Sequence, residues 1–365
     1  DGTLPKRRKI QQSNPLSPSL SPPPIGKLPP ELIGMITKYL DKTTLGNFSQ
    51  ANKEIRRAVL DTKHTQPADV ETARELTHRL EKNPNHPWKV EFDCKERIVD
   101  RIIDLDGLEY CKSASLAIQR PTEEILKAVG QLAFKVTLKV SIVVTAGLDL
   151  SVLGNVNTLN LFGTDVTDAS AFGKVTNLNL SYTKVRDVSA LGNVHNLNLA
   201  GTKVTDVGAL GNVQTLNLSR TGVTDVGALG NVKNLDLSHT GVTDVSALGN
   251  VKNLNLSWTD VKDVSALGKV KNLNLSQTGV KDVSALGNVK NLDLSHTKVT
   301  DVSALTNVTK LNITFTRVQI CDVSKFHNLE TLWISEGTTR IIGQNPGSEG
   351  VRERVRVLDR WGRRV

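Results

Sequence analysis

Histidine, cysteine and acidic side chains are those from which a catalytic or metal site would be built, and this sequence scatters them. Its seven histidines form no paired motif, and Cys94, Cys111 and Cys321 lie far apart, without metal-ligand spacing. The sequence contains no Gly-rich phosphate loop, His-Glu-x-x-His motif or nucleophile elbow. We therefore predict a protein that is not an enzyme and carries no cofactor and no metal. The isolated cysteines are typical of a reduced intracellular protein.

Side chains suited to binding recur instead at one position of a repeat. Leu-x-Leu pairs recur every 19 residues from Leu159/Leu161 to Leu292/Leu294, which is an unambiguous period. Two residues after each pair from Leu178/Leu180 to Leu311/Ile313 the residue type changes from unit to unit, and of these eight positions only Gly201 has no side chain. We call the other seven residues the variable ladder: Tyr182, Arg220, His239, Trp258, Gln277, His296 and Phe315.

Tyr, Trp and Arg dominate the binding energy of protein interfaces because they bury large areas or make paired hydrogen bonds. The sequence therefore predicts that the variable ladder contacts a partner. Neutral variation at an exposed position is the alternative interpretation. Under the partner hypothesis, Trp258→Ala and Arg220→Ala weaken binding and leave thermal stability almost unchanged.

Two charged rows accompany this ladder. An aspartate precedes each Val-Ser/Gly-Ala-Leu segment, where a carboxylate can accept backbone N–H bonds, and we predict this turn role rather than a calcium or catalytic one. The members are Asp168, Asp187, Asp206, Asp225, Asp244, Asp263, Asp282 and Asp301. A lysine row precedes the strand leucines, and the nearby aspartates favour a solvated face over an acidic or nucleic-acid partner. Its members are Lys233, Lys252, Lys271 and Lys290.

The net charge of +9 lies in the tails of the chain. Residues 1–27 and residues 340–365 each carry +4, which leaves +1 for the body between them. This distribution does not favour a nucleic-acid partner. The most apolar stretch, Val136 to Leu153, is interrupted by Lys139 and Asp149, so no membrane span is expected.

Alternation along each predicted strand turns both leucines inward and opens their neighbours onto one face. One 19-residue unit buries too few apolar side chains to offset its backbone entropy, so units must stack. Looser units are predicted at Val90/Phe92, Leu116/Ile118, Leu138/Val140 and Leu332/Ile334, which gives about thirteen short parallel strands.

The unit around Leu254, Leu256 and Thr259 resembles the leucine-rich repeat, with Thr where many members have Asn. Its Asp-Val-Ser-Ala-Leu segment is similar to the turn of internalin-type repeats. The resemblance implies an α+β repeat fold, in which residues 88–335 form a solenoid with a parallel β-sheet on its concave face.

Other segments frame this array. Residues 1–27 combine Ser/Pro-rich sequence with a basic run, and we predict a disordered leader. Lys6, Arg7, Arg8 and Lys9 resemble a nuclear localisation signal. Apolar residues at helical spacing predict short helices over 28–62 and a connector helix over 63–87. Residues 336–365 are either a cap or a basic tail, with a strand-like alternation from Val351 to Val357 left open.

Residues 28–60 resemble an F-box, opening with Leu28-Pro29-Pro30-Glu31-Leu32 and closing with Asn52-Lys53-x-x-Arg56. The resemblance implies binding to a Skp-type adaptor of a cullin ubiquitin ligase through Leu28, Pro29, Leu32, Ile36, Leu40 and Leu45. A helical cap for the solenoid is the alternative.

Together the two resemblances indicate an F-box/leucine-rich-repeat protein, an architecture found in protists and in the large viruses that infect them. They imply the substrate-recognition subunit of a Skp-cullin-F-box ligase, located in the cytoplasm or nucleus of a cell, or of a host cell if the protein is viral. The alternative is an interaction scaffold with no link to a ligase.

Overall fold

The computed structural model describes residues 10–12, 88–90, 92–93, 97–99, 105, 108, 111–143, 147–335, 339–343, 356–359 and 362–363. The chain divides into two compact units, Asp1–Leu159 and Asn160–Val365. The predicted nuclear localisation signal, the F-box-like segment with its six adaptor-binding residues and the connector helix lie outside the described residues.

Short strands organise the first unit. β1 (Ile10–Gln12) pairs antiparallel with β2 (Trp88–Val90). β3 (Phe92–Asp93) and β4 (Arg97–Val99) each run parallel to β5 (Cys111–Ile118), which also pairs with β6 (Thr137–Ile142). The strands predicted at Leu116/Ile118 and Leu138/Val140 are therefore confirmed.

A helix that the sequence analysis missed, α5 (Glu123–Leu132), lies between β5 and β6. Thr122 caps it, since its hydroxyl accepts the N–H of Ile125 at 3.2 Å, and two acidic residues occupy its first turn. Ile125 and Val129 are buried, and the helix packs on η4 (Ser151–Leu153). It is the one α-helix of the described residues, and none of their helices has the length and apolarity that a membrane crossing requires.

Repeated parallel strands build the second unit, following β7 (Thr158–Asn160) at its boundary. Neighbours from Asn177–Asn179 to Lys310–Asn312 align with a 19-residue offset, so that Leu235 lies beside Leu216 and Leu254. The strands are β8 (Asn177–Asn179), β9 (Asn196–Asn198), β10 (Thr215–Asn217), β11 (Asn234–Asp236), β12 (Asn253–Asn255), β13 (Asn272–Asn274), β14 (Asn291–Asp293), β15 (Lys310–Asn312), β17 (Thr331–Trp333) and β19 (Arg356–Leu358). β19 falls in the segment whose strand-like alternation was left open, and β17 confirms the unit predicted at Leu332/Ile334.

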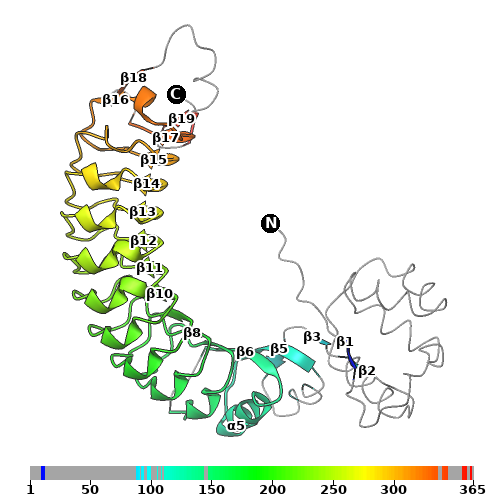
Figure 1. Ribbon diagram of the computed structural model, residues 1–365. Coiled ribbons are helices and arrows are strands. Elements are labelled where there is room, and N and C mark those ends of the chain that lie inside the picture. The colour runs from blue at the N-terminus through cyan, green and yellow to red at the C-terminus, as the bar shows by residue number, and fades with distance from the viewer. Residues whose placement is uncertain are drawn as a thin grey trace, which may run out of the picture. The chain divides into compact units, whose positions relative to one another are not determined.

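Short 3-10 helices occupy the side of the second unit opposite to strands β10 to β15 (Figure 1). They are η5 (Ser170–Phe172), η6 (Ser189–Leu191), η7 (Gly208–Leu210), η8 (Gly227–Asn231), η9 (Ser246–Asn250), η10 (Ser265–Leu267), η11 (Ser284–Leu286) and η12 (Val323–Lys325). A further parallel pair joins β16 (Ile320–Asp322) to β18 (Arg340–Ile342).

The core of each 19-residue repeat is a layer of leucine and valine. In the repeat that contains β12, five side chains are at most 3% exposed: Val251, Leu254, Leu256, Val264 and Leu267. Burying such a side chain contributes about 1.5–3 kcal/mol, and each layer is covered by the next. The predicted inward leucines are confirmed.

Glycines set the distance between neighbouring 3-10 helices. A Cβ added to Gly249 would lie 2.7 Å from the carbonyl oxygen of Ala266 in the next unit. Its φ is not positive, so the requirement is close approach rather than an unusual backbone. Six more glycines face the next unit in the same way, with added-Cβ distances of 2.4 to 2.8 Å: Gly173, Gly192, Gly211, Gly230, Gly268 and Gly287.

Buried threonines close the strand ends. The hydroxyl of Thr259 donates to the carbonyl of Leu256 at 2.6 Å, and the side chain is 4% exposed. This bond satisfies a carbonyl that leaves the strand, which explains how Thr substitutes for the Asn common in such repeats. The same bond recurs at Thr164, Thr183, Thr202, Thr221, Thr240, Thr278, Thr297 and Thr316.

The aspartate row has the predicted turn role. Oδ1 of Asp263 accepts the backbone N–H of Ser265 at 2.9 Å, at the start of η10. Equivalent bonds of 2.8 to 2.9 Å occur in all eight units of the row. The backbone and hydroxyl hydrogen bonds from the serine hold the carboxyl pKa below its ordinary value at Asp168, Asp187, Asp244, Asp263, Asp282 and Asp301.

Candidate recognition surface

The variable ladder has an unusual backbone. Its seven residues have φ between 56° and 60°, and they are the only non-glycine residues with positive φ in the part of the chain that the structure describes. Gly163 and Gly201 hold the same repeat position with φ of 68° and 67°. Every unit from β7 to β15 therefore makes the same left-handed turn after its strand.

Hydrogen bonds fix this turn in each unit. Oδ1 of Asn255 accepts the N–H of Ser257 at 3.1 Å, and the N–H of Trp258 donates to the carbonyl of Ser276 in the next unit at 3.0 Å. The Asx turn and the bond to the next repeat together accompany the left-handed conformation of Trp258. A left-handed backbone costs a residue other than glycine about 1–2 kcal/mol of conformational free energy. Bulky residues such as Trp258 rarely adopt it.

Side chains of the ladder project into solvent and stack on one another. Tyr182 and Trp258 are each 54% exposed, and Phe315 is 44% exposed. The rings of His239 and Trp258 stack at 5.2 Å with 11° between their planes, and those of His296 and Phe315 stack at 4.4 Å with 20°. Stacked rings lose little further freedom on binding, so the surface is pre-organised.

Phe162 extends this surface and was missed from the sequence. It is 55% exposed and meets the ring of Tyr182 edge to face at 5.6 Å. Phe162 lies one residue before the ladder position, which Gly163 occupies in its unit. An aromatic residue beside a glycine at that position was the available signal.

A separate open groove, with a volume of about 660 Å³, runs over strands β10 to β15 and β17. Outward residues of the strands line it, as predicted, but none of the seven ladder residues does. The ladder lies beyond the strand ends, next to the groove rather than inside it. Trp333 and Lys310 replace asparagines at the C-terminal end of the groove.

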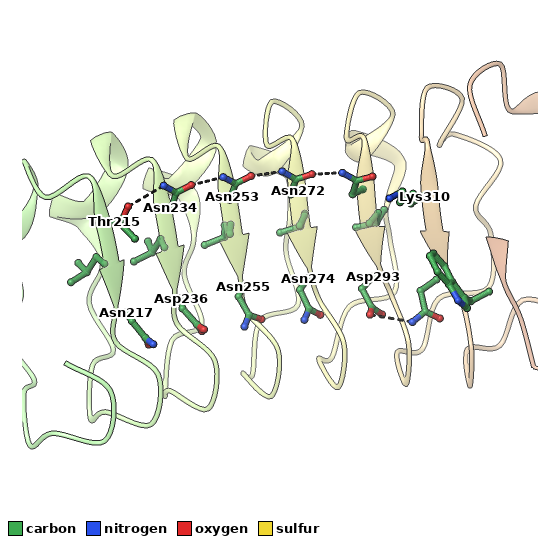
Figure 2. A pocket seen from close by; sticks show the side chains of 18 residues that line it. Thr215, Asn217, Asn234, Asp236, Asn253, Asn255, Asn272, Asn274, Asp293 and Lys310 are labelled. Carbon is green, nitrogen blue, oxygen red and sulfur yellow. Dashed lines mark hydrogen bonds between the residues drawn. The ribbon is translucent and has the colours of Figure 1, made fainter. Parts of the chain in front are cut away.

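Two rows of polar side chains follow the groove (Figure 2). In the first row the amides bond edge to edge: Asn234 donates to the hydroxyl of Thr215 at 3.1 Å, Asn253 donates to Asn234, and Asn272 donates to Asn253. The second row carries the Asx-turn residues, including Asp236 and Asp293. Most of these polar atoms therefore serve the turns and the neighbouring units.

No cluster of three or more His, Cys, Asp or Glu side chains among the described residues has the geometry to hold a metal ion. Cys321, the cysteine whose side chain is described, is buried, and burial raises the pKa of its thiol to about 12. Its sulfur is consequently a protonated core group rather than a nucleophile.

Similarity to known proteins agrees with this geometry. The family profile described as Leucine Rich repeat matches residues 212–230. The structure is similar to the crystal structure of an internalin (inlF) from Listeria monocytogenes, with a TM-score of 0.54 and 18% identity, over 77% of this chain and 94% of that one. The chain therefore has a leucine-rich-repeat fold. The internalin likeness agrees with the predicted resemblance of the Asp-Val-Ser-Ala-Leu turn.

Other solved leucine-rich-repeat proteins are similar at the same level. A TDR receptor has a TM-score of 0.51 and 16% identity to this chain, over 72% of this chain and 53% of the receptor chain. No curated protein matches the sequence. These similarities establish the fold.

Proposed function

We propose that this leucine-rich-repeat protein is a non-catalytic interaction protein that binds a protein partner through the variable ladder. The supporting observation is that seven residues of varied type, six of them exposed and Gln277 half-buried, stand where the backbone favours glycine. Gly201 demonstrates that the turn accepts glycine without a change of fold. Side chains kept at this position serve something other than folding.

Neutral variation accounts poorly for the composition of the ladder. A position under no demand except its backbone would accumulate glycine, or asparagine, which tolerates the left-handed region. The nine units from Gly163 to Phe315 hold two glycines and no asparagine. Large aromatic, arginine and histidine side chains predominate, which is the composition of interface hot spots.

A capture experiment tests this proposal. The full chain is immobilised, captured proteins are compared with those retained by the Trp258→Ala, Arg220→Ala double variant, and both chains are melted. We expect the variant to lose a specific partner at unchanged stability. Lys262→Gln with Lys281→Gln is the matched control, since both lysines are exposed in the same region. Equal capture by the double variant would reject the ladder as the binding surface.

The second proposal concerns the F-box-like segment and rests on sequence alone. We propose that Leu28, Pro29, Leu32, Ile36, Leu40 and Leu45 bind a Skp-type adaptor and thereby a cullin ligase. The variable ladder would then hold a target near a ubiquitin-charged enzyme and raise its effective concentration. An intracellular location, with nuclear import through Lys6, Arg7, Arg8 and Lys9, belongs to the same proposal.

A pull-down with a purified Skp-type adaptor tests the ligase connection. The native chain should retain the adaptor, and the Pro29→Ala, Leu32→Ala variant should not. Trp258→Ala serves as the control, because the ladder has no part in adaptor binding. Failure of the native chain to bind would leave the interaction scaffold without a ligase role.

A further inference from the structure

The lysine row has a rigid backbone. Its four residues, Lys233, Lys252, Lys271 and Lys290, are exposed and each directly precedes a strand, from β11 to β14. The N–H of Lys252 donates to the carbonyl of Lys233 at 3.0 Å, and Lys271 and Lys290 repeat the bond at 3.0 and 2.9 Å. Because adjacent strands lie about 4.8 Å apart, the row spans about 14 Å.

These positive charges are not neutralised within the described part of the chain. Its ion pairs are Lys127–Glu123 and Arg363–Asp359, and neither involves the row. The ammonium of Lys233 donates to Oε1 of Gln214 at 3.1 Å, and that of Lys290 approaches the carbonyl of Asn307 at 3.4 Å.

The sequence favoured a solvated face here because aspartates recur in every unit. In the structure those carboxylates accept backbone N–H groups at the starts of the 3-10 helices, beyond the strand ends, whereas the lysines precede the strands. The two rows therefore lie on different segments of each repeat, eight residues apart along the chain. The strand-start edge keeps an aligned set of four cations, and charge complementarity calls for an acidic partner.

We propose that the lysine row docks a partner α-helix that carries a stripe of acidic side chains. Residues three or four apart on a helix face lie about 5–6 Å apart, close to the 4.8 Å step of the row. Alternate residues of an extended peptide are about 6.7 Å apart. Over the three intervals of the lysine row, such a peptide would run about 6 Å out of register with the lysines. A helical stripe stays in register with all four lysines.

Nucleic acid fits this edge less well. Proteins that bind single-stranded nucleic acid combine basic grooves with aromatic side chains on which the bases stack. The exposed Phe, Tyr and Trp residues that the structure describes in the second unit are Phe162, Tyr182, Trp258 and Phe315. All four follow the C-terminal ends of strands, whereas the lysines precede the N-terminal ends. The row alone offers charge without stacking.

Two synthetic helical peptides of identical composition test the docking surface. One presents four glutamates at i, i+4, i+7 and i+11 on a single face, and the other distributes them around the helix. Fluorescence anisotropy measures their binding to the full native chain at low and high salt. We expect the striped peptide to bind more tightly, with an affinity that falls as salt increases.

Variants of the full chain assign the binding to the row. Lys252→Gln with Lys271→Gln should weaken the striped peptide about tenfold, since each exposed ion pair contributes modestly. Lys262→Gln with Lys281→Gln should leave it unchanged, as should Trp258→Ala, which separates this site from the variable ladder.

Three outcomes would overturn the proposal. They are equal binding of the two peptides, binding that is insensitive to the Lys252 and Lys271 changes, and tighter binding of an oligouridylate than of the striped peptide. Thermal melts of every variant confirm that the fold is retained, so that a loss of binding reports on charge alone.

Discussion

Each repeat of the second unit favours glycine at two places, and the two places differ in what they hold. At the 3-10 helices, glycine is kept in seven units because a Cβ would come within 2.4 to 2.8 Å of a carbonyl oxygen in the next unit. At the strand ends, φ near 60° also favours glycine, yet seven units carry larger side chains. Glycine is kept at the 3-10 helices, where packing requires it. It is replaced at the ladder, where it would only relieve backbone strain, so the ladder side chains serve a purpose other than folding.

The packing half of this comparison predicts the largest effect. Gly249→Ala should destabilise the chain by about 1–3 kcal/mol, because the new methyl group forces neighbouring units apart. Urea unfolding measures the loss. Gly208→Ser is the control, since six other repeats of the aspartate row carry serine at that position. A neutral Gly249→Ala would mean that the units separate freely, and the close-approach explanation would be wrong.

The buried threonine hydroxyls lie directly after the variable ladder and predict the next largest effect. Thr259→Val should cost about 1–2 kcal/mol, because the buried carbonyl of Leu256 loses its 2.6 Å partner while the side-chain volume is kept. Thr259→Ser retains the hydroxyl and should cost less. Chemical denaturation of both variants compares them, and equal losses would show that the hydroxyl bond contributes little.

At the ladder positions we expect a smaller effect on the free energy of unfolding, with glycine as the stabilising residue. Trp258→Gly should be about 1 kcal/mol more stable than Trp258→Ala, since only glycine adopts φ of 60° without strain. At Lys262, whose φ is not positive, glycine should be the less stable of the same two substitutions. If alanine is the more stable at both positions, the ladder carries no strain.

Acid unfolding gives the smallest expected effect. Hydrogen bonds from Ser265 and Ser284 lower the folded-state pKa of Asp263 and Asp282, so the unfolded chain binds protons first as pH falls. Their contribution is complete above the unfolded pKa of about 3.9 and is lost as pH falls through the lower folded values. Asp263→Asn with Asp282→Asn should reduce the slope of stability against pH below about 4. An unchanged slope would contradict this.

The repeat period, the inward leucines and the aspartate turns could be predicted because each depends on residue type and local alternation. The left-handed backbone of Trp258 could not, because it depends on the Asx turn of Asn255 together with a hydrogen bond to Ser276 in the next unit. The amide bonds of the groove likewise depend on the exact register between strands. α5 was missed although Thr122 and the spacing of Ile125 and Val129 signal a helix, because it interrupts the repeat pattern.

The most direct test replaces Arg220, His239, Trp258 and Gln277 together by glycine and measures both unfolding in urea and capture of the partner retained by the native chain. We expect the four-glycine variant to be at least as stable as the native chain and to lose the partner. A variant that unfolds more easily, or that captures the partner undiminished, would show that the variable ladder is part of the fold and not a recognition surface.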